Sequence, residues 1–472
     1  MGRAHRHACR RSNGVWSSRS ARGRSAERRR AGCRHRDGLQ SLRQALGELH
    51  RKRPPRSLKI NTGHGKNSVD PLREYEGDVT MQMCLICCPF NTSFGAYASS
   101  LKSAIERKTG GTIQWIGSNC GCGDPAERSR QFITNQCDYF EMPFPKSQRS
   151  PTAWKRLVLG VVRPAHRLVL PFRAKKYAEL SRNAELIHFQ QILNAYGSRV
   201  MFRWLAQPSS ATRVITVHEL DSDQLDVPAE SEAYNRADAI VVLYEAMRDQ
   251  LVRLKVRPEK VHVVLHGTDI PARSQGKREG IVFYGGHKIM AGKGLDTVFR
   301  AMTIIREQRP LSVPELTIHG HYGTETPEAA SQLARELGIA DKIVWRNQIS
   351  NGEIVQLYQR SLVCVLPYTG SFAGLAASAA AACELPIVAT RKAGLPDHLG
   401  DSGIWIDEND ADQLASRVLE LLDNENAWQA TSANVRRRAE EFLSWDVIAD
   451  DTLQVYQQAI ADKAMASARR AP

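Results

Sequence analysis

The segment from Leu362 to Gly403 constrains the fold of this chain most strongly. Its short apolar run Leu362–Leu366 is followed by a glycine-bearing loop, Ser371–Leu375, and then by the alanine-rich stretch Ala376–Cys383. A second short apolar run, Pro386–Thr390, leads into another glycine loop. Short apolar runs bounded by turn residues are typical of buried strands, and a helix N-terminus that follows such a strand is a ready anion site. The segment therefore predicts the nucleotide-binding edge of an open α/β sheet.

Alternating strand-like and helix-like runs extend over most of the chain. In the first half, the strand-like runs are Met83–Pro89, Thr112–Ile116, Glu185–Phe189, Val214–His218 and Ala239–Leu243. In the second half, they are Ile281–Tyr284, Leu316–His319, Lys342–Trp345, Leu362–Leu366, Pro386–Ala389 and Gly403–Ile406. Such alternation predicts parallel, doubly wound sheets. The polar run 270–277 separates the two sets, so we expect two Rossmann-like domains with a ligand-binding cleft between them.

The positive charge of the chain is concentrated near its start. Residues 1–60 contain 18 Lys and Arg against 3 Asp and Glu, which accounts for the net charge of +15. The remaining residues carry 47 charges of each sign, so this part gives no signal of nucleic-acid binding. Residues 1–60 hold few bulky apolar side chains, and we expect a disordered basic extension over 1–80, with Met81 and Met83 as candidate true starts. A transit peptide and a nucleic-acid-binding arm are the alternatives.

The 10 cysteines favour buried free thiols over a metal site. Cys84 and Cys87 have C-x-x-C spacing, but no second pair of this kind and no nearby histidine pair completes a zinc site. Free thiols indicate a reducing, cytoplasmic location. The sequence shows no signal peptide at its start and no apolar run of about 18 residues that would span a membrane.

Two motifs in the second half resemble the donor-binding region of GT-B glycosyltransferases of the GT4-like group. The run Ala382–Ala389 is similar to the family's small-Gly-x-Pro-Val-Val-Ala strand, with Glu384 where the family has glycine. The run Ala393–Asp397 is similar to its Gly-Gly-x-Pro-Glu loop. The family's two glutamates, which are separated by seven residues, are replaced by Ser371 and Ala379. Some branches of the family that act in polysaccharide assembly carry a Ser/Gly version of this loop.

The same resemblance implies a set of donor-binding residues. The run Phe283–Lys288, followed by Lys293–Asp296, is similar to the family's Gly-Arg and Lys-Gly-Leu-Asp element. Lys293 and Lys288 are the candidates for stabilising the negative charge that grows on a departing nucleoside diphosphate. Lys288 stands where the family has arginine and supplies a point charge instead of a bidentate fork. The alternative is that both are solvated surface lysines. The other donor-binding candidates are Gly285, Gly286, Ser371, Gly374, Leu375 and Ala379.

Further candidates lie in the first half of the chain. His218, at the end of a predicted strand, is similar to the histidine of the family's Val-x-His-Asp motif, which faces the cleft near the anomeric carbon. The alternative for such a histidine is a structural role, and His188 is a weaker candidate of the same kind. The loop from Asn91 to Gly95 follows the first strand, and we expect it on the acceptor side of the cleft. His266–Asp269 is similar to the turn that opens the C-terminal domain, where a structural role is expected.

The region Trp154–Leu170 mixes apolar and basic residues. Basic amphipathic segments can dock on anionic membranes, whereas the alternative is a partly buried helix with a basic rim. In family members that use lipid-linked acceptors, such a region approaches the inner membrane surface. A peripheral contact with the inner face of that membrane is therefore among the expectations.

The resemblance covers about Met83 to Ala459 and implies a complete architecture. After the extension, we expect an N-terminal Rossmann-like acceptor-side domain over 81–268 and a C-terminal nucleotide-sugar-binding domain over 269–440. A closing helix and tail over 441–472 should cross back to the first domain, as Phe442–Trp445 and Tyr456 suggest.

The function implied is transfer of a sugar, with retention, from a nucleotide-sugar donor to a lipid-linked saccharide or polysaccharide acceptor. The resemblance implies no metal and no cofactor, because basic side chains and a helix dipole replace a divalent cation, and no nucleic-acid partner is expected. Two alternatives stay open. One is a GT-B-like nucleotide-sugar-binding protein without turnover, motivated by the residues at 371 and 379, and the other is a sugar-nucleotide epimerase of similar fold.

Overall fold

A computed structural model describes residues 83–87, 93–117, 179, 181–190, 205, 209–218, 220, 227–286, 292–320, 328–347, 349–370 and 374–469. All of these residues belong to the unit Asp78–Pro472. Several expectations fall outside the described residues. They are the basic extension over 1–80, the region Trp154–Leu170, and the candidate residues Asn91, Lys288 and Ser371.

The first half of the described chain forms a six-stranded parallel sheet in the order β2-β1-β3-β4-β5-β6. Its strands are β1 (Met83–Cys87), β2 (Gln114–Gly117), β3 (Leu186–Gln190), β4 (Thr212–Val217), β5 (Ala239–Val242) and β6 (Val261–Val263). The helices described with it are α2 (Ser93–Thr109), α6 (Val227–Asn235) and α7 (Glu245–Arg253), and a 3-10 turn, η2, spans Pro258–Lys260. The five predicted strands are confirmed with shifted ends, and β6 was not predicted.

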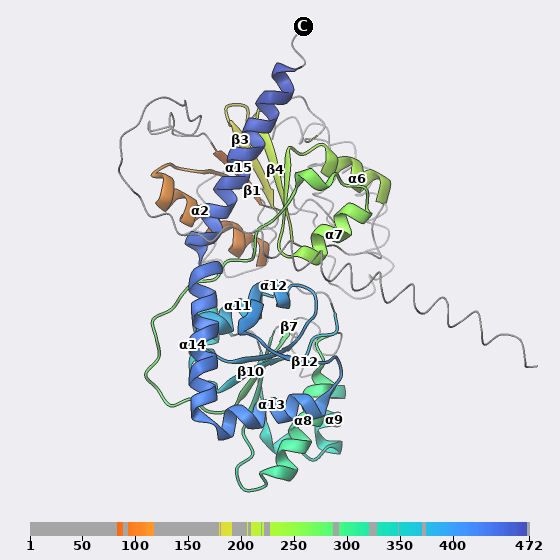
Figure 1. Cartoon of the computed structure of the whole chain (residues 1–472), viewed down its shortest axis with the longest axis vertical. Coiled ribbons are helices and arrows are strands. Elements are labelled where there is room, and N and C mark those ends of the chain that lie inside the picture. The colour runs from red at the N-terminus through yellow and green to blue at the C-terminus, as the bar shows by residue number, and fades with distance from the viewer. Residues whose placement is uncertain are drawn as a thin grey trace, which may run out of the picture. The chain divides into compact units, whose positions relative to one another are not determined.

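The second half forms another six-stranded parallel sheet, in the order β12-β11-β10-β7-β8-β9 (Figure 1). Its strands are β7 (Ile281–Gly286), β8 (Leu316–Gly320), β9 (Ile343–Asn347), β10 (Val363–Leu366), β11 (Ile387–Thr390) and β12 (Ile404–Ile406). Its helices are α8 (Leu295–Gln308), α9 (Glu328–Glu336), α10 (Asn351–Arg360), α11 (Leu375–Ala382), α12 (Leu395–Leu399), α13 (Ala411–Asp423) and α14 (Glu425–Phe442). Its 3-10 turns are η3 (Ala340–Lys342) and η4 (Gly400–Ser402). The predicted doubly wound sheets are thus confirmed.

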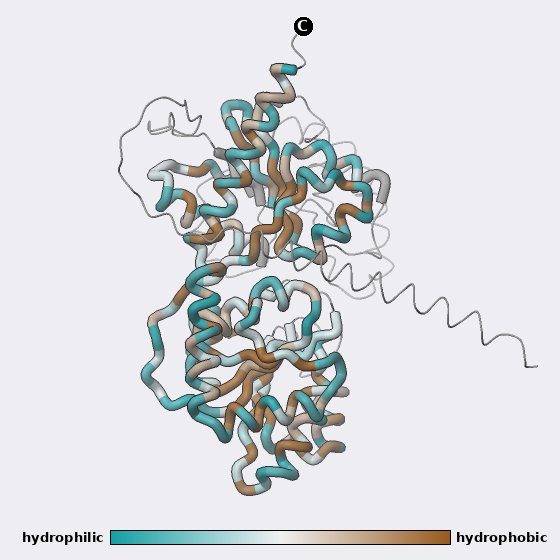
Figure 2. The backbone as a smooth tube through the Cα atoms, viewed as in Figure 1, coloured by the Kyte–Doolittle hydropathy of each residue, from teal (hydrophilic) through white to brown (hydrophobic). Residues whose placement is uncertain are grey.

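Local sequence signals explain where several helices begin. Ser350 caps α10 through a full capping box with Glu353, whose carboxylate accepts the Ser350 N–H at 2.8 Å. Asp410, Asn424 and Ser444 each accept a backbone N–H at the first turn of α13, α14 and the last helix, α15 (Trp445–Ala468). Such caps satisfy N–H groups that have no partner within the helix. The strands between the helices are apolar, as the brown central segments of Figure 2 show, so burial of both sheet faces follows from the sequence.

The last helix, α15 (Trp445–Ala468), returns to the first sheet. Its residues Trp445, Ile448 and Tyr456 belong to the apolar core of the N-terminal sheet. By contrast, Val435 and Ala439 of the preceding helix α14 belong to the core of the C-terminal sheet. Ion pairs reinforce the return, because Arg107 and Lys108 of α2 contact Asp446 and Asp450, each at 2.9 Å. The predicted crossing back of the closing helix is therefore confirmed.

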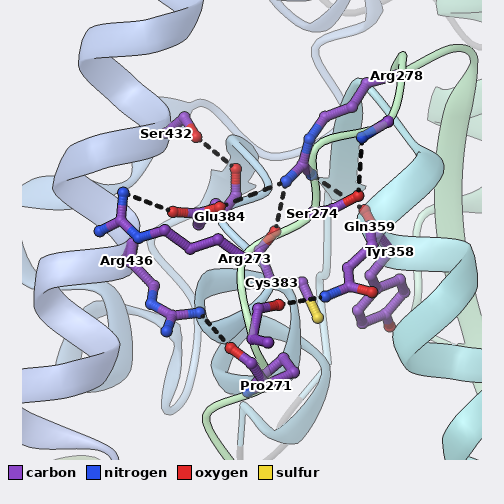
Figure 3. A network of polar contacts seen from close by, with 12 residues as sticks. Pro271, Arg273, Ser274, Arg278, Tyr358, Gln359, Cys383, Glu384, Ser432 and Arg436 are labelled. Carbon is purple, nitrogen blue, oxygen red and sulfur yellow. Dashed lines mark hydrogen bonds and ion pairs between the residues drawn. The ribbon is translucent and has the colours of Figure 1, made fainter.

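Residues 264–280 connect β6 of the first sheet to β7 of the second. An arginine network holds this connector against the C-terminal sheet (Figure 3). Glu384, in the turn between α11 and β11, has a φ of 60°, a left-handed conformation that favours glycine. Its carboxylate pairs with Arg273 at 3.1 Å and with Arg278 at 3.8 Å. Arg436 of α14 donates to the carbonyl oxygens of Pro271 and Ala382 at 2.9 and 2.6 Å. The glutamate that replaces the family's glycine thus has a structural role.

Candidate donor site

Glycine geometry at the end of β7 fixes the position of Lys293. The pairing of β7 with β8 shifts register between Tyr284 and Gly286, which is the mark of a bulge. Gly292 and Gly294, on either side of the lysine, have φ values of 69° and 72°. A Cβ at Gly294 would lie 2.0 Å from the carbonyl oxygen of Pro367, so no other residue fits there. The Gly292 carbonyl accepts two backbone N–H groups from the loop after β10, those of Thr369 and Gly370, at 3.0 and 2.9 Å.

Lys293 is not a solvated surface lysine, because its side chain is only 6 % exposed. Its Nζ lies 3.9 Å from the ring centre of Tyr368 and 5.1 Å from that of Tyr284. Burial lowers the pKa of Lys293 to about 7, since removal from water disfavours the charged form. The lysine is therefore poised between its neutral and charged forms at neutral pH, and an arriving anion favours the charged form. Its Cε also lies 3.4 Å from the position of a Cβ on Gly286.

The N-terminus of α11 follows β10, the neighbour of β7 in the sheet, so its backbone N–H groups lie at the same carboxyl edge of the sheet as Lys293. Gly374 is the N-cap, with a φ of 82° and no side-chain cap, and no acidic side chain lies in the first turn of this helix. Free N–H groups and the helix dipole favour an anion there. Leu375 is exposed at 37 %, and Ala379 is half-buried one turn further on. Apart from Leu375, the side chains in the first turn of α11 are small.

His398 of α12 supports this helix end. A Cβ on Gly374 would lie 2.8 Å from the imidazole Nδ1 of His398, so the ring packs directly against the N-cap. The Nδ1–H donates to the Gly394 carbonyl at 2.7 Å, and Nε2 accepts the backbone N–H of His266 at 3.3 Å. Burial lowers the pKa of His398 to about 3. The ring is thus neutral, and its tautomer is fixed by its two partners.

His218 lies directly after β4 and is 5 % exposed. Its Nε2 donates to the Gln190 side-chain oxygen at 2.8 Å, and the Gln190 amide lies 3.2 Å from the His188 ring. His188 contacts the hydroxyls of Tyr456 and Thr216 at 2.6 and 2.7 Å. Burial, with His266 and His188 nearby, holds the pKa of His218 well below its ordinary value. His218 is thus a neutral hydrogen-bonding group rather than a charge at neutral pH.

Aromatic contacts link His218 to the donor-side helix. The Tyr97 ring of α2 lies edge-on to His218 at 4.8 Å and to His266 at 5.0 Å. Since His266 also bonds His398, a continuous path of contacts runs from His218 to Gly374. Gly285 and Gly286 end β7, and Gly286 lies next to the Lys293 side chain. Gly95 is buried within the first turn of α2, which begins at Ser93. Gly95 was expected where the loop meets the helix, and the helix begins two residues earlier, at Ser93, so Gly95 lies in the helix; its place on the acceptor side stays a prediction.

The sequence did not reveal Tyr284, Tyr368 or His398 as residues of this site. Tyr368 follows β10 by two residues, and an aromatic residue just beyond the carboxyl end of a strand is the one signal that points to it. In the described ranges, no group of three or more His, Cys, Asp or Glu is arranged to hold a metal ion. None of the helices that the structure describes is long and apolar enough to cross a membrane.

Comparisons with known proteins show the family of the chain and support its fold. The family model described as "Glycosyl transferases group 1" matches residues 278–424, and that described as "Glycosyl transferase 4-like domain" matches residues 120–267. A D-inositol 3-phosphate glycosyltransferase from Mycolicibacterium smegmatis is 29 % identical over 253 residues, which cover 49 % of this chain and 56 % of that protein. An MMP alpha-(1->4)-mannosyltransferase from Mycolicibacterium hassiacum is 29 % identical over 230 residues, covering 48 % of this chain and 54 % of that protein. The match spans little more than half the length of these curated relatives.

Solved structures share the fold at low sequence identity. Sucrose-phosphate synthase from Thermosynechococcus elongatus superposes with a TM-score of 0.61 and 19 % identity, over 81 % of this chain and 100 % of that one. HepE from Anabaena, solved in complex with UDP-glucose, superposes with a TM-score of 0.59 and 13 % identity, over 80 % and 99 %. With its two parallel sheets, its returning C-terminal helix and both family matches, the chain belongs to the GT4-like group of GT-B glycosyltransferases.

Proposed function

We propose that this protein transfers a sugar from a nucleotide-sugar donor to a saccharide acceptor, with Lys293 and the N-terminus of α11 binding the donor diphosphate. The observation that carries this proposal is the buried Lys293 ammonium at the carboxyl end of β7. As the glycosidic bond breaks, negative charge grows on the departing diphosphate. A fixed cation and fixed N–H groups stabilise that charge most in the transition state.

The finer features of the reaction belong to the same proposal. The donor is a nucleotide-sugar, and HepE, which was solved in complex with UDP-glucose, supports a UDP-sugar. Transfer proceeds with retention, as the family resemblance implies. It needs no divalent metal, because Lys293 and the α11 dipole supply the positive charge. The acceptor is a lipid-linked saccharide or polysaccharide, reached by peripheral contact with the inner face of the membrane. The neutral His218 hydrogen-bonds the donor sugar or the acceptor, as its position beyond β4 suggests.

A second candidate function is nucleotide-sugar binding without turnover. It is motivated by the absence of carboxylates at residues 371 and 379, where the family has glutamates. An enzyme in which those contacts are replaced by others would still release the nucleoside diphosphate, whereas a binding protein would not.

Release of the nucleoside diphosphate tests the proposal. The purified protein is incubated with UDP-glucose, UDP-N-acetylglucosamine or GDP-mannose, with excess EDTA, and with or without a lipid extract or polysaccharide acceptor. Acceptor-dependent release of UDP or GDP supports transfer. Binding with no release from any of these donors supports the binding protein, and conversion of the donor sugar without release supports an epimerase.

A further inference from the structure

Two tyrosine rings enclose the Lys293 ammonium. The ring centre of Tyr368, which follows β10, lies 3.9 Å from Nζ, and that of Tyr284, in β7, lies 5.1 Å away. Both distances fall within about 6 Å, the range in which a ring face attracts a cation. Tyr284 lies in β7 and Tyr368 follows β10, the neighbouring strand of the same sheet, so the cage exists only in the folded domain.

Both rings are themselves held in place. Tyr368 is 2 % exposed, its hydroxyl donates to the Tyr284 carbonyl at 3.3 Å, and its own carbonyl accepts the Thr390 hydroxyl at 2.6 Å. The Tyr284 ring packs against His319 with ring centres 5.1 Å apart, and His319 bonds the Tyr358 hydroxyl at 2.9 Å. Rings fixed in this way present a constant surface to the lysine.

We propose that Tyr368, assisted by Tyr284, is a positioning residue that holds the Lys293 ammonium where it meets the β-phosphate of the donor. This inference rests on the proposed function, because it takes Lys293 as the diphosphate contact. An aromatic face attracts the ammonium without carrying a negative charge of its own, so the attraction remains available to an arriving anion.

The cage also offsets part of the effect of burial. Burial alone favours the neutral amine, whereas the electron-rich ring faces favour the ammonium. The Lys293 side chain therefore needs little reorganisation when the diphosphate arrives, because its position is already set. The only change that remains is protonation of those Lys293 amines that are still neutral.

The competing explanation is that both rings only fill the core of the C-terminal sheet. Removal of a core ring loosens the whole domain, so every nucleotide would lose affinity to a similar extent. Loss of a positioning ring would instead weaken only those ligands that carry a β-phosphate. Comparison of diphosphates with monophosphates separates the two explanations.

The experiment measures dissociation constants by calorimetry for UDP and UMP, and for GDP and GMP, in wild type, Tyr368→Phe and Tyr368→Leu. The phenylalanine keeps the ring face, and the leucine removes it. For the diphosphate that wild type binds, we expect Tyr368→Leu to weaken binding about 10-fold, as loss of a desolvated cation–π contact predicts. Binding of the matching monophosphate to Tyr368→Leu should change less than about 2-fold, because a monophosphate has no β-phosphate for Lys293 to contact. Tyr368→Phe should bind the diphosphate nearly as tightly as wild type, because the phenylalanine keeps the ring face.

Two controls keep the result interpretable. Phe299→Leu removes another fully buried ring of the same core, in α8. It should lower the melting temperature without weakening diphosphate binding more than monophosphate binding. Tyr284→Leu and Tyr284→Phe repeat the comparison at a less buried ring if Tyr368→Leu does not fold.

The outcomes separate this inference from the proposed function. Equal losses for diphosphate and monophosphate, or a Tyr368→Phe variant as weak as Tyr368→Leu, would overturn the positioning role and leave the donor site intact. A wild-type protein that binds neither UDP nor GDP more tightly than the monophosphates would overturn the proposed donor site, and the positioning role with it.

Discussion

The imidazole Nε2 of His398 accepts a hydrogen bond from the backbone N–H of His266 at 3.3 Å. His398 lies on α12, and its imidazole ring packs against Gly374, the N-cap of α11. His266 lies between β6, the last strand of the first sheet along the chain, and β7, the first strand of the second sheet. A single neutral ring therefore joins the donor-side helix end to the connector. The ring must stay unprotonated at Nε2 to accept this bond.

Buried neutral histidines should make the protein sensitive to acid. Burial lowers the pKa of His188 and His398 to about 3, and that of His266 and His319 to about 4. Since the unfolded pKa is about 6.5, the unfolded chain binds more protons than the folded one below that pH. The free energy of unfolding is therefore unaffected by these histidines above about pH 6.5. Below that pH it falls by about 1.4 kcal/mol per pH unit for each histidine, until the folded-state pKa of about 4 or 3 is reached.

Urea unfolding at a series of pH values measures this slope. His398→Gln keeps an acceptor for the His266 N–H but cannot take up the proton. Below about pH 6, the variant should take up about one proton fewer on unfolding than wild type. The slope of its unfolding free energy against pH should therefore be smaller by about 1.4 kcal/mol per pH unit. An unchanged slope would show that His398 does not titrate on unfolding.

The left-handed backbone conformation at Glu384 should affect the free energy of unfolding of two substitutions differently. Glu384→Ala removes the ion pairs with Arg273 and Arg278 and keeps a side chain at a positive φ. We expect a loss of about 2 kcal/mol in unfolding free energy. Glu384→Gly loses the same pairs but fits the backbone, so it should be about 1 kcal/mol more stable than Glu384→Ala. Chemical denaturation checks the order, and a glycine variant less stable than the alanine variant would contradict it.

Donor binding should depend on pH through Lys293. Burial lowers the pKa of Lys293 to about 7 before the donor binds, and a bound diphosphate favours the ammonium. Affinity should therefore be highest below pH 7 and fall as the pH rises above it. The fall should approach about tenfold per pH unit until the pKa of the lysine in the complex is reached. Calorimetry in buffers of different ionisation enthalpy should show proton uptake on binding near pH 7. Lys293→Met should show neither the uptake nor this pH dependence, and its persistence would assign the effect to another group.

A carboxylate at residue 379 should not improve nucleotide binding. Ala379 is half-buried on α11, one turn from the N-cap that faces the proposed diphosphate. Ala379→Glu restores the family's residue, but it places a negative charge close to another anion, so we expect affinity to fall by about threefold or more. Ala379→Gln has nearly the same volume without the charge and is the matched control. Tighter binding by the glutamate variant would show that the ribose contact of the family is still available here.

The sequence predicted the architecture well because short apolar runs alternate with helices, and burial on both sheet faces demands that pattern. It missed β6, whose three residues Val261–Val263 include a polar histidine, and α12, whose five residues resemble a loop. It found Lys293 through a motif but not the burial of its side chain. The cage of Tyr284 and Tyr368 could not be predicted, because it forms between strands β7 and β10, about 80 residues apart in the chain.

Turnover by Lys293→Met, measured as acceptor-dependent release of UDP or GDP in the presence of EDTA, tests the central claim most directly. The proposed donor site predicts a loss of about 100-fold or more, roughly 3 kcal/mol in transition-state stabilisation. The melting temperature at neutral pH should be no lower than that of wild type, because methionine removes a buried amine whose pKa is depressed. Wild-type turnover and wild-type nucleotide affinity in a folded Lys293→Met protein would contradict the account, since the donor diphosphate would then bind elsewhere.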